Sequence, residues 1–250
     1  MHHRRTSGSH STDPSSSISA VGLPRSRLLK SAVRLSLVLH FSLASHAIAQ
    51  SVDIDGDTTP SALPSDGVLG ADLLIGETGI GSLSILDGGS VSNWYGVLGD
   101  QVGGEGSARV AGTSPGGTQS SWSNSGNLTI GAQGNGTLIV ESGGVVSHMD
   151  GMLGEQGTGV GEATVAGEGS RWINSGRLVV GNYGTGRLRI EDRATVTSDG
   201  GIVGAGNSPA SSEVVVTGGA RGLGRVFARR LADLGADIAV LDIDLNAAQK

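Results

Sequence analysis

The residues with the clearest capacity for chemistry lie near the end of the sequence. There a glycine-rich run, Thr217-Gly218-Gly219-Ala220-Arg221-Gly222-Leu223-Gly224, follows the apolar residues Val214 to Val216 and precedes a helical pattern through Leu234. Glycines between a strand and a helix let the backbone approach a pyrophosphate, which the amide groups at the helix N-terminus can bind. A second strand ends at Asp242, whose carboxylate could accept hydrogen bonds from ribose hydroxyls. The pattern predicts a dinucleotide site.

This arrangement resembles the opening of the short-chain dehydrogenases/reductases, with their TGxxxGxG loop and an acidic residue after the second strand. The resemblance covers residues 213–250 and implies a Rossmann-like βαβ fragment that binds NAD or NADP. The residues that would bind the cofactor are Gly218, Gly222, Leu223, Gly224 and Asp242. A working member also carries a catalytic Ser and a YxxxK pair, but neither Tyr95 nor Tyr183 has Lys four residues on. No catalytic residue is assigned, and we do not expect an enzyme.

Other catalytic and metal-binding chemistry finds little support. The chain has no Cys, which excludes disulfides, thiolate metal sites and Cys nucleophiles. Five of its six histidines lie within residues 1–49, so His148 stands alone in the rest of the chain. Asp53, Asp55 and Asp57 have the spacing of a calcium loop, but the glycine and the closing glutamate of such a loop are absent. We therefore predict no metal site and no Ser/His/Asp triad.

Most of the chain is a glycine-rich internal repeat. The stretch Leu73-Leu74-Ile75-Gly76 recurs as Leu128-Thr129-Ile130-Gly131 and again as Leu178-Val179-Val180-Gly181, 55 and then 50 residues further on. Within each repeat, apolar residues alternate with polar ones in short runs between glycine turns, which is typical of short strands with one buried face. The five-residue difference falls in Thr113 to Ser121, which we interpret as an enlarged loop.

Each repeat has two similar halves of roughly 20 to 30 residues, the length of one coil of a parallel β-helix, in which coils stack ~4.8 Å apart. No coil can bury its apolar face alone, but about six stacked coils give a continuous apolar core. Trp122 and Trp172 occupy equivalent positions in successive repeats. We expect them to be buried in the stack, and carbohydrate stacking is the alternative role.

The repeat unit, LxIGxxGxGxLxI…GGxV…LG…AxVxG…SxWxNSG, resembles the repeats of bacterial autotransporter passengers and related outer-membrane adhesins over residues 73 to about 212. The fold class expected is therefore mainly β, a right-handed parallel β-helix (solenoid) with the short α/β fragment at its C-terminus. The resemblance also implies ligands on host-cell or matrix surfaces and a C-terminal β-barrel translocator. The 38 residues after position 212 could not form that barrel, so we interpret the sequence as a truncated passenger.

The beginning of the sequence has the features of an export signal. Arg25, Arg27, Lys30 and Arg34 lead into the apolar run Leu35 to Ala44. The run is followed by Ala47-Ile48-Ala49, a sequence of the kind that signal peptidase cleaves, and we predict cleavage after Ala49. Because the apolar run is shorter than the ~20 residues that span a bilayer, no transmembrane anchor is expected, and a buried helix is the alternative. The product would be exported, to be periplasmic, displayed on the cell surface or secreted.

Four regions result: a leader and signal peptide (1–49), a linker (50–72), the solenoid repeats (73–212) and the truncated dinucleotide-binding fragment (213–250). Residues 50–212 hold six Arg against seventeen acidic residues, a balance that repels nucleic-acid phosphates. We therefore expect no nucleic-acid partner.

The junction near residue 213 fits two patterns at once. Gly201 to Gly204 begins the second half of a third repeat, which predicts a strand near residues 214–218, where the dinucleotide pattern also places one. We interpret the chain as two unrelated coding sequences joined at a point of chance similarity. A genuine two-domain design is the alternative.

Overall fold

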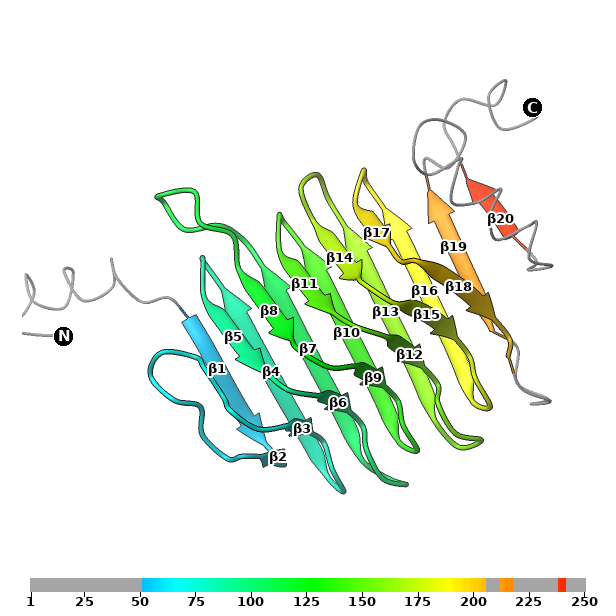
Figure 1. The fold of residues 1–250 in the computed structure, drawn as a ribbon, viewed down its shortest axis with the longest axis horizontal. Coiled ribbons are helices and arrows are strands. Elements are labelled where there is room, and N and C mark those ends of the chain that lie inside the picture. The colour runs from blue at the N-terminus through cyan, green and yellow to red at the C-terminus, as the bar shows by residue number, and fades with distance from the viewer. Residues whose placement is uncertain (1–50, 206–211, 218–237, 242–250) are drawn as a thin grey trace, which may run out of the picture. The chain divides into compact units, whose positions relative to one another are not determined.

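Residues 51–205, 212–217 and 238–241 are described by the computed structural model, and they form a β-solenoid of stacked coils (Figure 1). Three sheets run along the stack, and each complete coil contributes one strand to each sheet. The sheets are parallel except at the N-terminal end, where β1 pairs with β4 and β2 with β3 in antiparallel fashion. The predicted β-solenoid is thus confirmed for these residues.

Within each sheet, neighbouring strands come from successive coils. In spatial order, sheet A contains β1 (Ser51–Gly56), β4 (Ile80–Leu86), β7 (Glu105–Ala111), β10 (Asn135–Glu141), β13 (Val160–Ala166), β16 (Thr185–Glu191), β19 (Glu213–Thr217) and β20 (Ile238–Leu241). Sheet B contains β18 (Gly200–Val203), β15 (Arg177–Val180), β12 (Gly151–Leu153), β9 (Leu128–Ile130), β6 (Gly96–Leu98), β3 (Leu73–Ile75) and β2 (Thr58–Thr59). Sheet C contains β17 (Thr195–Thr197), β14 (Arg171–Asn174), β11 (Val145–His148), β8 (Ser121–Asn124) and β5 (Ser90–Asn93).

Residues 51–59, within the stretch expected as a linker, form the two antiparallel strands β1 and β2 at the first coil. Val52 and Ile54 of β1 pack against the core, as does Leu63 of the following loop. An exposed first coil would leave apolar side chains and strand edges uncovered, so this segment caps the stack. The acidic residues that alternate with Val52 and Ile54 obscured this strand in the sequence.

The core alternates between two kinds of coil. In one kind, the inward residues of sheets B, A and C include a Leu, a Leu and a Val, as in Leu128, Leu138 and Val146. In the other kind, the equivalent residues are Gly, Ala and Trp, as in Gly151, Ala163 and Trp172. One large indole therefore accompanies two small residues, which keeps the volume of successive coils similar and the core densely packed. This alternation explains why the sequence repeats every two coils.

The glycines of the second kind of coil make room for the sheet C side chains. A Cβ atom on Gly96 would lie 2.6 Å from Asn124 Oδ1 and 2.9 Å from Trp122 Cζ2. A Cβ atom on Gly151 would lie 2.4 Å from Asn174 Oδ1. Real Cβ contacts of this kind are longer, so a larger residue at either position would displace the buried polar row of sheet C.

Three expectations from the repeat pattern are confirmed. Both Trp122 and Trp172 are completely buried. The enlarged loop is present, and it carries an isolated bridge between Thr113 and Gln119. A strand, β19, forms where the third repeat predicted one, with Val214 opposite Leu188 of β16.

The α/β character expected for residues 213–250 is not observed. In the described parts of that segment, residues 213–217 and 238–241, the structure is entirely β, and the described solenoid contains no helix. The helical pattern through Leu234 falls outside the described residues.

Candidate functional site

The predicted dinucleotide-binding residues lie outside the described part of the structure. They are Gly218, Gly222, Leu223, Gly224 and Asp242. The strands that precede them are described: β19 ends at Thr217 and β20 ends at Leu241. These strands are parallel neighbours in sheet A, with Val214 opposite Ile238. A βαβ unit requires such a parallel pair, because its crossover brings the chain back in the same direction.

Strand β19 also continues the solenoid. Its other neighbour is β16, so it lies between a solenoid strand and β20. Residues that pair across successive solenoid strands, such as Leu138 and Ala163, are 25 positions apart, and Val214 and Ile238 are 24 positions apart. The spacing expected of the βαβ unit is therefore close to the length of one coil.

The three valines of β19 differ from the rest of sheet A in their burial. Val214, Val215 and Val216 are all buried, with 2%, 9% and 2% of their surface exposed. In β16, by contrast, the residue opposite Val215 is Arg189, which points outward and is exposed. A strand that is buried on both faces is typical of sheets in α/β proteins, whereas the solenoid strands bury one face.

A row of buried polar side chains runs along the inner face of sheet C. Its members are Asn93, Asn124, His148 and Asn174, one from each of four successive strands. Trp122 Nε1 donates a hydrogen bond to Asn93 Oδ1 (2.7 Å), and Trp172 Nε1 donates to His148 Nε2. Each indole thus bonds to the row member of the preceding coil. These two hydrogen bonds stabilise the row, since an unpaired buried polar group costs about 1–3 kcal/mol.

His148 is the one titratable member of this polar row. Burial lowers its pKa to about 4, against the opposing effects of the Asp150 backbone and carboxylate. Because Nε2 accepts the Trp172 hydrogen bond, the neutral ring carries its proton on Nδ1. Nδ1 has no hydrogen-bond partner, and neither has Asn124 Nδ2 of the adjacent coil. The ring is therefore a neutral acceptor that is locked in the core.

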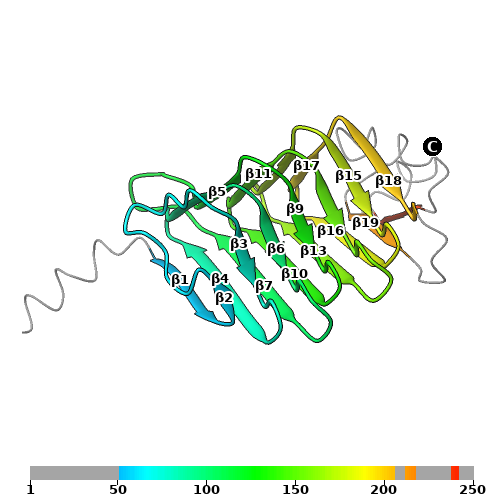
Figure 2. The same ribbon diagram turned by 60° about the horizontal axis from the view of Figure 1, so that its bottom comes forward.

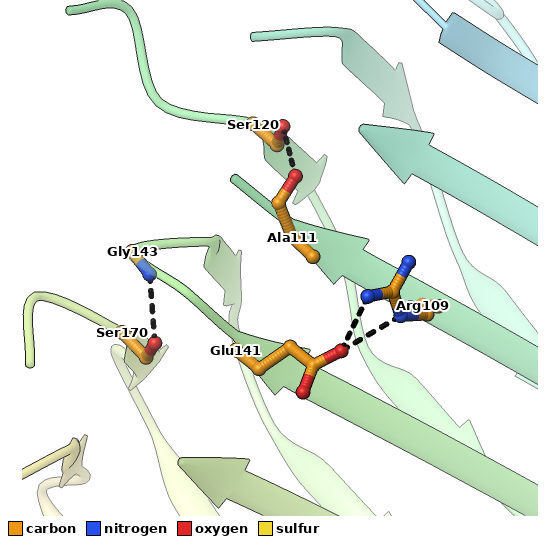
Figure 3. A network of polar contacts seen from close by, with 6 residues as sticks. All are labelled: Arg109, Ala111, Ser120, Glu141, Gly143 and Ser170. Atoms are coloured by element: carbon orange, nitrogen blue, oxygen red, sulfur yellow. Dashed lines mark hydrogen bonds and ion pairs between the residues drawn. The ribbon is translucent and has the colours of Figure 1, made fainter. Parts of the chain in front are cut away.

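Two buried serines, Ser120 and Ser170, belong to the turns between sheets A and C (Figure 3). Ser120 Oγ donates to the Ala111 carbonyl (2.7 Å), and Ser170 Oγ accepts from the Gly143 amide (3.0 Å). These bonds satisfy backbone groups that the turns leave unpaired. Neither serine bonds to His148, whose ring nitrogen bonds to an indole. The described residues thus contain no Ser–His pair for nucleophilic catalysis.

A row of carboxylates follows sheet B. Glu77, Asp100 and Glu155 each lie two residues after a strand of that sheet. Burial raises the pKa of Asp100, with a smaller contribution from Glu77, and burial also raises the pKa of Glu155, with a smaller contribution from Asp100. The ion pairs of the described residues join arginines to other carboxylates. The row therefore holds like charges without a counter-ion.

Among the surface cavities, two are lined entirely by described residues of the solenoid. One, of about 420 Å³, is lined by β1, by residues 61–67 and by Ser90. Asp53 and Asp66 give this cavity a polar lining suited to a hydrogen-bonding ligand. The other, of about 220 Å³, lies on the outer side of sheet A between β13, β16 and β19.

Metal-binding clusters and membrane-spanning helices are both absent from the described ranges. Those residues include no group of three or more His, Cys, Asp or Glu side chains placed to hold a metal ion. No helix among them is both long enough and apolar enough to cross a membrane.

Comparisons with known proteins give one short similarity. Over 42 residues the chain is 55% identical to a cyclohexanol dehydrogenase from Rhodococcus sp. (strain TK6). The match covers 16% of this chain and 16% of that protein, so the chain spans about a sixth of the length of this relative. No protein-family model matches the chain, and no solved structure matches it. The similarity supports the short-chain dehydrogenase resemblance over a short segment, and no autotransporter family is shown.

Several features were not predicted from the sequence. The exposed aromatic residues Trp94 and Tyr95 lie at the corner between sheets C and B, with 57% and 49% of their surface exposed. The buried polar row was also missed, although Asn93, Asn124 and Asn174 recur at equivalent places. The signal that could have revealed this row is an Asn two residues after the inward residues Val91, Trp122 and Trp172.

Proposed function

We propose that the chain is an exported, non-enzymatic β-solenoid that acts by displaying a binding surface outside the cytoplasm, as autotransporter-like passengers do. The observation that carries this proposal is the filled core. Its largest side chains, including Trp122 and Trp172, are completely buried, so ligands can reach only the outer faces. Stacked coils create long, regular surfaces of this kind, which repeat proteins use for binding. The leader sequence is consistent with a product that is periplasmic, displayed on the cell surface or secreted.

Export is tested by expressing the whole gene in a Gram-negative host and determining the N-terminus of the product. We expect the mature chain to begin at Gln50 and to be found outside the cytoplasm. The variant Ala49→Arg should block cleavage and leave the leader attached. An uncleaved wild-type chain that stays in the cytoplasm would contradict the proposal.

The binding role is tested by adding the mature product to cultured host cells and to immobilised matrix proteins. Saturable retention that the unlabelled protein abolishes is the expected result. If the protein is folded and exported but shows no saturable retention on any of these surfaces, an adhesive role is excluded.

A second candidate function is dinucleotide binding by the C-terminal segment. It is favoured by the parallel β19–β20 pair and by the 42-residue similarity to a dehydrogenase. In this proposal Gly218, Gly222, Leu223 and Gly224 surround the pyrophosphate of NAD, and Asp242 accepts from its ribose. An isolated βαβ unit would lack further strands to complete its sheet. In this chain the solenoid strand β16 pairs in parallel with β19 and extends the sheet. This candidate concerns binding and includes no catalytic step.

Dinucleotide binding is tested by NMR of the whole chain with NAD at millimolar concentration. Chemical-shift changes that disappear in the variant Gly222→Val are expected. If the spectrum of the wild-type chain does not change, the segment does not bind the cofactor.

A further inference from the structure

The outward side chains of sheet B form an apolar row along the solenoid. The strands of this sheet face the viewer in Figure 2. Each three-residue strand of this sheet buries its first and third residues and turns the middle one outward, as in β3 and β12. The outward residues of the six parallel strands are Leu74, Val97, Thr129, Met152, Val179 and Ile202. Thr129 is buried, Ile202 is 37% exposed, and the other four are partly exposed.

The other two sheets turn mainly polar side chains outward, although Ile173 of sheet C and Ile80 and Ile139 of sheet A also face outward. Sheet C presents Ser92, Ser123 and Ser147 at equivalent positions. Sheet A presents charged residues such as Arg109 and Glu162, which take part in ion pairs. The solvent-facing residues of a half-buried sheet are normally polar. Of the three faces, sheet B therefore has the composition of an interaction surface.

Acidic groups border the apolar row on both sides. The carboxylates of Glu77, Asp100 and Glu155 follow the strands of sheet B, and Asp72 and Asp150 precede them. The basic side chain in the same border is that of Arg177, directly before Leu178 of β15. The border is thus strongly acidic, and the three carboxylates that follow the strands form no ion pair with a described residue. A cationic partner would remove the repulsion within this border.

We propose that the outer face of sheet B binds a cationic amphipathic helix, with an apolar stripe on the row and Lys or Arg side chains on the acidic border. Six strands ~4.8 Å apart span about 24 Å, which matches a helix of roughly 16 residues. A second copy of the chain would bring one acidic border against another, and an anionic membrane would be repelled in the same way. This inference rests on the proposed function as a binding scaffold, and it specifies the face and the partner.

The test uses the whole chain and a fluorescent helical peptide of about 18 residues built from Leu and Lys, with its Leu/Glu counterpart as the charge control. Fluorescence anisotropy should show saturable binding of the Leu/Lys peptide that weakens as salt increases, and no binding of the Leu/Glu peptide. Equal binding of both peptides would overturn the charge argument. Tighter binding to vesicles of anionic lipid than to the Leu/Lys peptide would identify a membrane surface instead.

Two sets of variants locate the site. The double variant Val97→Thr/Val179→Thr should weaken peptide affinity about tenfold, because each change removes an apolar contact of about 0.7 kcal/mol. Ile173→Thr, which makes the same kind of change on the outward face of sheet C, should leave affinity unchanged. The far-UV circular dichroism and melting temperature of each variant establish that it is folded.

The acidic border is tested separately, at positions that do not contribute to the core. Asp100→Asn/Glu155→Gln should weaken binding about tenfold at low salt and flatten its salt dependence. Glu141→Gln removes a carboxylate paired with Arg109 on sheet A and is the matched control. If Glu141→Gln weakens binding as much as the double variant, the peptide is attracted by the overall negative charge of the protein. The assignment of the binding site to sheet B would then be wrong. An exported chain that binds cells but not the peptide would refute this inference alone.

Discussion

The solenoid contains two nearly equivalent buried pairs that differ in one side chain. In one pair Trp122 donates to Asn93, and in the other Trp172 donates to His148. Both indoles are completely buried and both acceptors lie on the inner face of sheet C in the preceding coil. In both pairs a neutral side chain accepts the indole hydrogen bond, so an amide and an imidazole can serve the same structural role.

The two acceptors differ in how the remainder of each side chain is satisfied. Asn93 Nδ2 donates to Asn124 Oδ1 (2.7 Å) and to the Tyr95 carbonyl (2.8 Å). His148 Nδ1 has no such partner. The histidine pair is thus the weaker version of the same arrangement, and it is also the one that can change its charge.

The largest effects are expected from removing the indoles. Trp122→Ala and Trp172→Ala should each lower the free energy of unfolding by about 3–5 kcal/mol, because each leaves a large cavity and an unpaired acceptor. Urea unfolding followed by circular dichroism measures both. Trp94→Ala removes an exposed indole and should change stability by about 0.5 kcal/mol or less. If Trp172→Ala also changed the free energy of unfolding by only about 0.5 kcal/mol, the stability of the core would not depend on the coil that contains Trp172.

The next effect is a loss of stability in acid that only the histidine pair contributes. The folded state lowers the pKa of His148 from 6.5 to about 4, so the unfolded chain binds the proton more tightly. The stabilising contribution is therefore complete above about pH 6.5 and is lost as the pH falls toward 4, by on the order of 3 kcal/mol. Protonation would also place an N–H donor on Nε2 opposite the Trp172 donor.

This acid effect is isolated by the variant His148→Asn, which copies the other pair. Unfolding free energies of both proteins are compared at pH 7.5, 6 and 5. The raised pKa values of Asp100 and Glu155 have the opposite sign, since they favour the folded state as the pH falls, but they are common to both proteins. The free energy of unfolding of the wild-type protein should therefore fall relative to that of His148→Asn as the pH is lowered from 7.5 to 5. A difference that is constant with pH would refute the role of His148.

The reciprocal change tests whether the two pairs are equivalent. Asn93→His should create an acid-sensitive pair in the first repeat, with stability again lost below about pH 6.5. At pH 7.5 it should lower the free energy of unfolding by about 1–3 kcal/mol, because Asn124 Oδ1 loses its donor. A variant that gains no acid sensitivity would show that the surroundings of Asn93, rather than the residue itself, distinguish the two pairs.

The sequence predicted the stacked coils because its two signals are local. Alternating apolar residues and glycine turns recur in register, and the burial of Trp122 and Trp172 followed from their equivalent positions. The side-chain pairs could not be predicted, since Asn93 and Trp122 are 29 residues apart and meet only when coils stack. The apolar row on sheet B was missed for a similar reason. Its members, such as Leu74 and Val97, are single residues in separate strands.

The C-terminal segment shows a different limit of sequence reasoning. Val214 to Val216 satisfies both the solenoid pattern and the dinucleotide pattern, and β19 pairs with a strand on each side. Because one coil and one βαβ unit have nearly the same strand spacing, local sequence cannot separate them. The neighbours of such a strand are decided by pairing between residues far apart in the sequence. A short sequence pattern carries no information about that pairing.

The smallest effect concerns the turns that follow sheet A, where a similar comparison can be made. Of the turns after β4, β10 and β16, the first two place Gly88 and Gly143 at a position with positive φ, and the third places Arg193 there, with φ 65°. A residue with a Cβ atom is strained in this left-handed region by about 1–2 kcal/mol, and glycine is not. Part of this gain is offset because glycine makes the unfolded chain more flexible.

Arg193→Gly should therefore raise the free energy of unfolding by about 0.5–1 kcal/mol. The ion pair that it removes, Arg193 with Glu168, joins two side chains that are 80% and 78% exposed, so its loss should matter little. Arg193→Ala removes the same ion pair but keeps a Cβ atom, and thermal melts of the two variants separate the effects. If both variants are stabilised equally, relief of backbone strain at residue 193 is not the cause of the gain in stability. The positive φ of Arg193 would then not make this turn less stable than the turns with Gly88 and Gly143.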